Sequence, residues 1–258
     1  MPQRSNDFIQ SLERGLAVMN SFSRERTNQT LSEVAQLTGL TRATARRVLL
    51  TLAELGYVHQ SSRSFSLTPK MLDLGYSYLS SLEVVEVAQR PMERLVEEVR
   101  ESSSMSVLDG SEIVYVARVP TKRIMTIALA LGSRLPAYPT SMGRVLLSGL
   151  PDSQIDDYIE QTRLERLTPH TVTDPAEFRA AIDEVRATGF ALVDQELEVG
   201  VRSIAAPIVN GRREIIAAMN ISCHASRVTL GQIRGEFRPK LIATAHEISR
   251  LARALPGN

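Results

Sequence analysis

The stretch that most constrains the fold of this chain runs from Thr30 to Arg63. It opens with a Thr-x-x-Glu pattern, in which Thr30 and Glu33 can each accept a hydrogen bond from the backbone N–H of the other. This capping box predicts a helix over residues 31–38. Gly39 predicts the end of that helix, because glycine readily adopts the left-handed conformation that closes helices. A short helix followed by a tight turn is therefore expected.

A second helix is predicted directly after the turn, because Thr41 can cap it. Apolar residues then recur at helical spacing, which predicts a buried stripe of Ala45, Val48, Leu49 and Leu52. The opposite face, at about 100° per residue, carries Arg42, Ala43, Thr44, Arg46, Arg47 and Leu50. Arginine offers a planar fork of donors to guanine edges or phosphates, and short neighbours let a helix approach the bases. These residue types favour a helix that enters the major groove of DNA.

Two strand-like runs, Gly56–Gln60 and Ser64–Leu67, flank a polar turn at Ser61–Arg63. Two helices followed by a hairpin predict a winged helix, which is a DNA-binding fold. We expect major-groove contacts from Thr41, Arg42, Ala43, Thr44, Arg46 and Arg47, phosphate contacts from Thr30 and Ser32, and a backbone or minor-groove contact from Arg63. The pattern leaves one alternative open, an ordinary helical hairpin with a solvated basic face.

The length of 258 residues favours two domains. Residues 1–80 hold nine Arg and Lys against six Asp and Glu, a net charge of +3, whereas the remaining residues hold 21 against 23, a net charge of −2. The positive excess lies where DNA would bind. We expect a winged-helix domain over 1–68, a linker helix over 69–83 and a second domain over 84–258.

The single cysteine, Cys223, excludes an internal disulfide and is compatible with a reducing compartment. The sequence shows neither a basic-then-apolar leader nor an apolar run long enough to span a bilayer. We therefore expect a soluble cytoplasmic protein that does not contact a membrane.

Helical spacing also predicts elements around the winged helix. A helix over 7–22, with Leu12, Leu16 and Met19 on one face, is expected to pack under the two-helix motif, and residues 24–29 are expected to be a polar loop. A linker helix should run from Pro69 to Leu79. A further amphipathic helix is predicted over 84–101, in which Pro91 favours a kink or a break near Arg90.

The second domain mixes strands and helices and predicts an α+β fold. Strands are expected at 105–108, 113–119 and 124–131, as a meander that residues 132–139 interrupt, and at 190–193, 203–209 and 214–222. Helices are expected at 142–148, 151–161 and 175–188, with a terminal helix from the cap at Thr229 to about Leu255.

Several local strings resemble the IclR-type bacterial transcriptional regulators over nearly the whole chain. They are Leu40–Arg47, Leu55–Val58, Pro136-x6-Gly143, Asp194-x-Glu196-x3-Gly200-Val201-Arg202 and Ala205-Ala206-Pro207. The run from Gly132 to Leu147 is similar to the branch that regulates protocatechuate, 4-hydroxybenzoate and β-ketoadipate catabolism. The resemblance implies a GAF-like effector-binding domain, homodimers made largely through the winged helices, and often dimers of dimers.

The second domain is expected to bind a small carboxylate. The start of the helix after Pro139 exposes the backbone amides of residues 141–143, which suit an anion. The resemblance brings in effector contacts from Ser141, Met142, Asp194, Glu196, Val201, Ser203, Asn220 and Ser222; many relatives have cysteine where this chain has Ser203. Arg134 is an added candidate, by chemistry, for pairing with a ligand carboxylate, and its alternative is a solvated loop arginine.

Together these patterns predict a ligand-responsive, DNA-binding regulator of an aromatic-acid catabolic operon, with protocatechuate or β-ketoadipate as the effector and with no cofactor or metal. Catalysis is not expected. Cys223 and His224 are neighbours on a strand, so their side chains should diverge, and Asp194 and Glu196 have no histidine nearby in sequence to complete a catalytic or metal-binding set. The alternative is a small-molecule-binding or hydrolytic α+β domain fused to a winged helix that binds DNA or protein.

Overall fold

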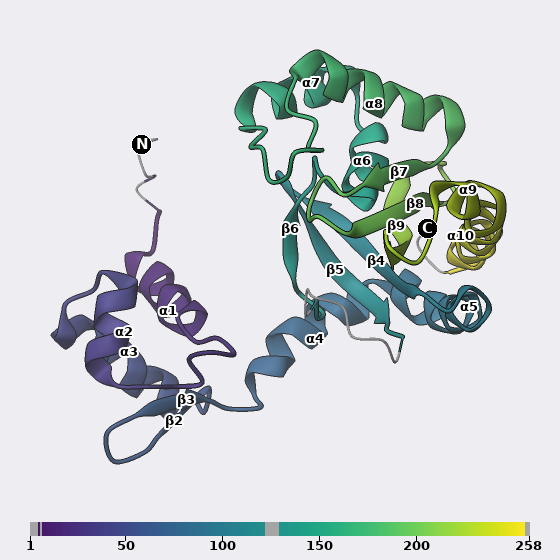
Figure 1. Cartoon of the computed structure of the whole chain (residues 1–258). Coiled ribbons are helices and arrows are strands. Elements are labelled where there is room, and N and C mark those ends of the chain that lie inside the picture. The colour runs from purple at the N-terminus through teal and green to yellow at the C-terminus, as the bar shows by residue number, and fades with distance from the viewer. Residues whose placement is uncertain (1–4, 6, 122–128, 256–258) are drawn as a thin grey trace. The chain divides into compact units, whose positions relative to one another are not determined.

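The computed structural model describes residues 5, 7–121 and 129–255, and the chain divides into two units, Met1–Ser81 and Leu82–Asn258 (Figure 1). The first unit contains helices α1 (Gln10–Asn20), α2 (Leu31–Thr38), α3 (Arg42–Glu54) and α4 (Met71–Ser81). The predicted capping box is confirmed: Glu33 N donates to Thr30 Oγ1 over 3.3 Å, and Thr30 N donates to Glu33 Oε2 over 2.7 Å. Gly39 ends α2 in the left-handed region, at φ 65°.

The wing is a three-stranded sheet in the order β1 (Asn28–Gln29), β3 (Phe65–Leu67) and β2 (Val58–Gln60). The hairpin was expected, but the expectation of a polar loop over 24–29 is wrong at its end, because β1 pairs antiparallel with β3. Gln29 explains this pairing. Its side chain is buried and its Nε2 donates to Ser21 O over 2.9 Å, so a polar residue is fixed inside the domain.

The core of the first unit lies between the three N-terminal helices and the wing. Val18, Ala45 and Leu49 are fully buried within it. The prediction for α1 is wrong at two positions, because Leu12 and Leu16 are exposed to 59% and 47%, and only Met19 of that stripe packs against the core. α1 turns the face that carries Val18 inward, which leaves Leu12 and Leu16 at the surface.

The second unit is built on one antiparallel sheet of six strands, in the order β6-β5-β4-β9-β8-β7. The strands are β4 (Ser102–Asp109), β5 (Glu112–Val119), β6 (Arg134–Pro136), β7 (Ala191–Asp194), β8 (Val201–Val209) and β9 (Ile215–His224). Residues 124–128 of the strand expected at 124–131 lie outside the described residues, and 129–131 form no strand. The interruption expected at 132–139 instead contains β6, whose Leu135 pairs with Ile113 of β5.

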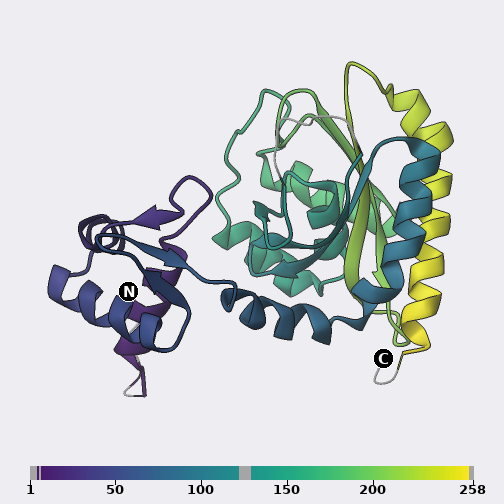
Figure 2. The same ribbon diagram turned by 90° about the horizontal axis from the view of Figure 1, so that it is seen from below.

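Helices cover both faces of this sheet (Figure 2). α5 (Glu83–Val99) and α10 (Arg238–Arg253) lie together on one face, and α6 (Ser141–Ser148), α7 (Asp152–Gln161) and α8 (Pro175–Thr188) lie on the other. α5 continues through Pro91 without the break expected near Arg90. The expected terminal helix is divided into α9 (Leu230–Gln232), a π-helical turn (Ile233–Phe237) and α10. Among the described residues, no helix is both long and apolar enough to cross a membrane.

Candidate functional sites

The outer face of α3 forms a basic surface. Thr41, the N-cap, accepts a hydrogen bond from Thr44 N over 3.2 Å, so the first turn of the helix is fixed. Ala45 and Leu49 bury the opposite face in the core. Exposed or half-exposed positions on the outer face are Thr41, Arg42, Ala43, Thr44, Arg46 and Arg47. Within the part of the chain that the structure describes, none of these three guanidinium groups lies within ion-pair distance of a carboxylate, so their charge is available to a partner.

The other predicted DNA contacts lie at the start of α2 and at the tip of the wing. Thr30 Oγ1 donates to Glu33 Oε2 over 2.8 Å, and this bond, after that from the Thr30 backbone, lowers the pKa of the Glu33 carboxyl. Ser32 is exposed beside them. Arg63 is exposed in the turn that Ser61 N closes with a bond to Ser64 O. The Thr30 hydroxyl is thus already engaged, whereas Ser32 and Arg63 remain accessible.

The second unit holds a small cavity between the sheet and the start of α6. Its volume is about 40 Å³, and it is lined by Tyr115, Leu129, Pro139, Thr140, Ser141, Met142, Leu197, Val201, Ser203, Asn220 and Ser222. Six of the effector contacts that the resemblance implies therefore meet in one place, although they come from α6, β9 and the start of β8. Pockets for drug-sized ligands are about 300–1,000 Å³, so the walls must separate before an organic acid can enter.

The polar groups of this cavity form one hydrogen-bonded network. The hydroxyl oxygens of Ser141 and Ser203 lie 2.6 Å apart, and Asn220 Nδ2 donates to Ser203 Oγ over 3.0 Å. Asn220 Oδ1 accepts from Ser104 N over 2.9 Å, which fixes the orientation of the amide. These side chains are pre-oriented, and a ligand can exchange its own polar atoms for the bond between the two serines.

The start of α6 supplies backbone donors, though fewer than expected. Gly143 N donates to Thr140 Oγ1 over 3.0 Å, so this amide is not available to an anion, contrary to the prediction. The amides of Ser141 and Met142 bond to no group among the described residues. The close approach of the two segments depends on glycine, because a Cβ at Gly143 would lie 2.0 Å from the carbonyl oxygen of Ala137.

Tyr115 is a cavity residue that the sequence patterns did not single out. Removal from water raises the pKa of its buried phenol to about 12, partly opposed by the positive charge of Arg118. The phenol is therefore a protonated donor at neutral pH. The signal that could have identified it is its place on the inner side of a strand next to β4, where Tyr115 pairs with Ser106.

Three predicted effector contacts do not line the cavity. Arg134 donates to Glu112 and Asp109, each over 2.7 Å, and these hydrogen bonds raise the pKa of its guanidinium. Asp194 pairs with Arg202 and Glu196 with Arg144. Each charged group already has an internal partner, so we no longer assign Arg134, Asp194 and Glu196 to the ligand. Leu197, next to Glu196, reaches the cavity instead.

The remaining reactive side chains are structural in this arrangement. Burial raises the pKa of the Cys223 thiol to about 12, and Cys223 donates to Arg202 O over 3.6 Å. His224 is exposed and bonds to Ser226, so the two neighbouring side chains do diverge. Over the described residues, no three His, Cys, Asp or Glu side chains lie close enough together to hold a metal ion.

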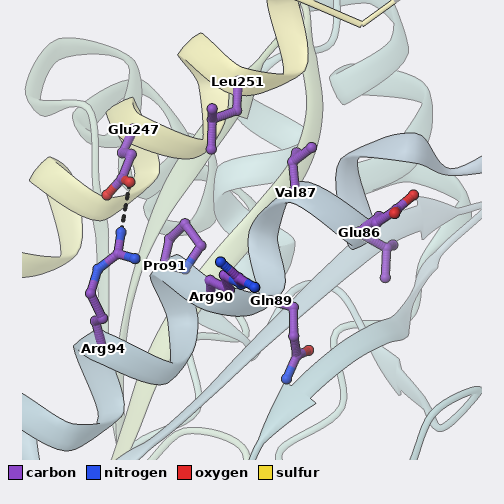
Figure 3. A pocket seen from close by; sticks show the side chains of 9 residues that line it. Glu86, Val87, Gln89, Arg90, Pro91, Arg94, Glu247 and Leu251 are labelled. Atoms are coloured by element: carbon purple, nitrogen blue, oxygen red, sulfur yellow. Dashed lines mark hydrogen bonds and ion pairs between the residues drawn. The ribbon is translucent and has the colours of Figure 1, made fainter.

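A larger hollow, of about 730 Å³, lies on the opposite face of the sheet between α5 and α10 (Figure 3). Arg94 spans it with an ion pair of 2.6 Å to Glu247, and both side chains are at least one-third exposed. Figure 3 shows Pro91 and Val87 of α5 and Leu251 of α10 among the side chains that line it. This groove is open and its charged groups are solvated, whereas the small cavity encloses converging polar groups, and the latter is the better candidate for a ligand.

Both units of the chain match models of a known protein family. The family model described as the bacterial transcriptional regulator IclR C-terminal domain matches residues 76–250, and the IclR helix-turn-helix domain matches residues 11–62. The chain belongs to the IclR family. The predicted fold, a winged helix followed by an α+β effector-binding domain, is thereby confirmed, and the homologues of this IclR-family protein are transcriptional regulators.

Three relatives illustrate the similarity. The chain is 41% identical over 243 residues to the Pca regulon regulatory protein of Pseudomonas putida, covering 94% of this chain and 84% of the relative. A Rhodococcus sp. RHA1 protein described as a transcriptional regulator is 54% identical, with a TM-score of 0.86 over 95% of this chain and 98% of that one. The PobR inducer-binding domain from Acinetobacter, a double mutant in complex with 3-hydroxybenzoic acid, is 37% identical, with a TM-score of 0.62 over 65% of this chain and 98% of that one.

Proposed function

We propose that this IclR-family protein regulates an operon for the catabolism of an aromatic acid, and that a small carboxylate effector changes its affinity for operator DNA. The observation that carries the proposal is the convergence of Ser141, Ser203 and Asn220 on one enclosed cavity. The names of two relatives agree with it: one regulates the Pca regulon, and the other binds 3-hydroxybenzoic acid in its inducer-binding domain. Protocatechuate and β-ketoadipate are the effectors we favour.

In this proposal the effector lies between the start of α6 and the sheet. A carboxylate accepts from the free amides of Ser141 and Met142, where the helix dipole also favours negative charge. Hydroxyl or keto groups bond to Ser203, Asn220 and Ser222. The side chains of Met142 and Val201 form an apolar wall beside them.

DNA binding is assigned to α3, α2 and the wing. Arg42, Arg46 and Arg47 contact the major groove together with Thr41, Ala43 and Thr44, while Ser32 meets phosphate and Arg63 reaches the backbone or the minor groove. Thr30, whose N–H and hydroxyl both donate to Glu33, fixes the start of α2 beside Ser32. The unpaired charge of the three α3 arginines supports this assignment, since solvated guanidinium groups can release counterions when they bind DNA.

Assembly as a homodimer is part of the proposal, because one recognition helix reads only a few base pairs. The winged-helix unit exposes an apolar groove of about 510 Å³, whose walls include Leu12, Leu16, Leu55 and Leu74. Exposed apolar surface of this kind is typical of an interface. A second winged helix is the occupant we propose. Two such dimers then pair to give the dimer of dimers that the family resemblance implies. Light scattering that gave one 28.5 kDa chain with full operator affinity would contradict it.

The central experiment is a thermal-shift titration of the full chain with a panel of aromatic and ring-opened acids. A ligand at about one hundred times its Kd adds about 2.7 kcal/mol of stability to the state it binds. We expect saturable stabilisation by protocatechuate or β-ketoadipate, with recovery of the acid unchanged. Chemical conversion of the acid would instead support the enzyme alternative.

A further inference from the structure

Arg118 on β5 does not line the cavity, but hydrogen bonds through Ser104 join it to the polar residues that do. Its Nη1 donates to Ser104 Oγ over 3.3 Å. Ser104 N donates to Asn220 Oδ1 over 2.9 Å, and Asn220 Nδ2 donates to Ser203 Oγ over 3.0 Å. The sheet register agrees, because Ser104 pairs with Arg118 on one side and with Asn220 on the other. Paired residues of an antiparallel sheet share a face, so Arg118 lies on the cavity face.

A β-bulge produces this placement. Met105 pairs with Ala117, but Ser106 pairs with Tyr115, so the register shifts by one residue between them. Tyr115 and Arg118 are three residues apart and would point to opposite faces of a regular strand. Because of the bulge, the phenol and the guanidinium share the inner face. Bulges often re-aim side chains beside functional sites.

Arg118 differs from the other half-buried arginines of this unit in having no acid beside it. Arg202 bonds to Asp194, and Arg179 bonds to Asp152. No carboxylate among the described residues lies within ion-pair distance of Arg118, whose guanidinium donates to the neutral hydroxyl of Ser104. Partly removing a charge from water is unfavourable unless a counter-charge is supplied. A ligand carboxylate would supply it.

The two positive ends of the site lie on different strands. Arg118 is on β5, whereas the start of α6 lies over Ser203 on β8. In the order β5-β4-β9-β8 these strands are three steps apart, about 14 Å at the usual spacing of adjacent strands. A ligand that used both ends would span the strands between them, over Asn220.

We propose that Arg118 binds a second carboxylate of the effector, so that the cavity selects a linear dicarboxylate of the β-ketoadipate class over a monocarboxylate. This inference rests on the proposed function, since it requires an acid in this cavity. The first carboxylate meets the amides of Ser141 and Met142, the chain crosses Asn220, and the second carboxylate meets the fork of Arg118.

The test compares β-ketoadipate with 3-oxohexanoate, which lacks the second carboxylate, by isothermal titration of the full chain. Wild type should bind β-ketoadipate at least tenfold more tightly, as expected for a hydrogen-bonded charge pair. Arg118→Gln should lose that preference by weakening β-ketoadipate alone. Arg118→Lys, which keeps the charge but not the fork, should retain part of it. The matched control is Arg94→Gln, on the far side of the sheet, which should bind as wild type does.

The outcomes separate the two proposals. An undiminished preference in a folded Arg118→Gln variant would overturn the role of Arg118, as would a wild type that binds protocatechuate but not β-ketoadipate. If Arg118→Gln failed to fold, a full wild-type preference in Arg118→Lys would overturn it. Equal binding of the two acids by wild type would overturn it in any case. A wild type that bound neither protocatechuate nor β-ketoadipate would contradict the proposed function itself.

Discussion

Arg144 on α6 and Glu196 in the loop after β7 form an ion pair of 2.6 Å, with both side chains less than one-tenth exposed. Arg144 Nε also donates to Tyr138 O, and Glu196 Oε2 accepts from Val172 N over 3.0 Å. The guanidinium lies over the ring of Phe178 at 5.8 Å. The pair therefore joins the helix that begins at the cavity to the loop that places Leu197 in its wall.

Breaking this pair should destabilise the second unit. Arg144→Met leaves the Glu196 carboxylate buried without its counter-charge, which typically costs about 3–5 kcal/mol. Urea denaturation followed by circular dichroism should show the loss in the transition of the second unit. Arg163→Met is the control, since Arg163 forms an exposed pair with Glu165 and its loss should cost under about 1 kcal/mol. Equal stability of the two variants would refute the structural role assigned to the buried pair.

Gly143→Ala should also be strongly destabilising. The added Cβ would lie 2.0 Å from the Ala137 carbonyl oxygen, so the segment before α6 would have to move. The control is Gly75→Ala in α4, where nothing lies within 4 Å of the added atom and alanine should be neutral or stabilising by up to about 1 kcal/mol. Thermal melting of both variants measures the difference. A Gly143→Ala protein that melted with wild type would show that the close approach is not required.

The free energy of unfolding at alkaline pH should depend on the buried thiol of Cys223. The pKa of Cys223 is raised from 9.0 to about 12 in the folded chain, mainly by loss of water. Below pH 9 the thiol holds its proton in both the folded and the unfolded chain, and the stabilisation is complete. Between pH 9 and 12 the unfolded chain loses the proton while the folded chain keeps it. The free energy of unfolding therefore falls as pH rises, by at most about 1.4 kcal/mol per pH unit. Cys223→Ala should reduce this slope. The free energy of unfolding at pH 8, 9 and 10 for the two proteins would measure it, and parallel slopes would count against the shift.

The recognition helix can be tested by mobility shift. Arg46→Ala and Arg47→Ala should each cost about 1–3 kcal/mol if the residue reads a base, and should flatten the preference at one base pair. Arg63→Ala should instead weaken all sequences alike. Arg163→Ala, in the second unit, is the control for loss of one positive charge. Wild-type affinity in the Arg46→Ala, Arg47→Ala double variant would exclude α3 as the reading element.

Local chemistry explains which features the sequence could predict. The capping box of Thr30 and Glu33 and the cap at Thr41 depend on residues three positions apart, and each was found where expected. The features that were missed depend on pairing over long distances. β1 forms because Gln29 pairs with Phe65 of β3. α1 turns Val18 inward because Val18 packs against the buried apolar residues of α2 and α3.

The cavity residues also divide into those that the sequence could predict and those whose role depends on the fold. Ser141, Met142, Ser203, Asn220 and Ser222 were identified through family resemblance and lie together. The same resemblance assigned Asp194 and Glu196 to the ligand, and chemistry assigned Arg134; only the fold reveals that each is paired internally. Arg118 could not be placed by alternation, because a single-residue bulge in a strand pair reverses the face on which it lies.

Removing the cavity's side-chain partners should separate effector response from DNA binding. The Ser222→Ala, Asn220→Ala variant loses hydrogen bonds to the effector but leaves the winged helix unchanged, so basal operator affinity should equal that of wild type. Because Asn220 Oδ1 accepts from Ser104 N, its truncation should also cost about 1–3 kcal/mol of stability, and measurements belong well below the melting temperature. Ser226→Ala, in which the hydroxyl that bonds to His224 outside the cavity is removed, is the control.

An effector shifts DNA affinity only when it binds one of two states of the protein more tightly than the other, with a typical coupling of about 1–3 kcal/mol. Operator titration with and without effector should show that shift in wild type and in Ser226→Ala, and none in the double variant. A full response in the double variant would move the effector site away from this cavity.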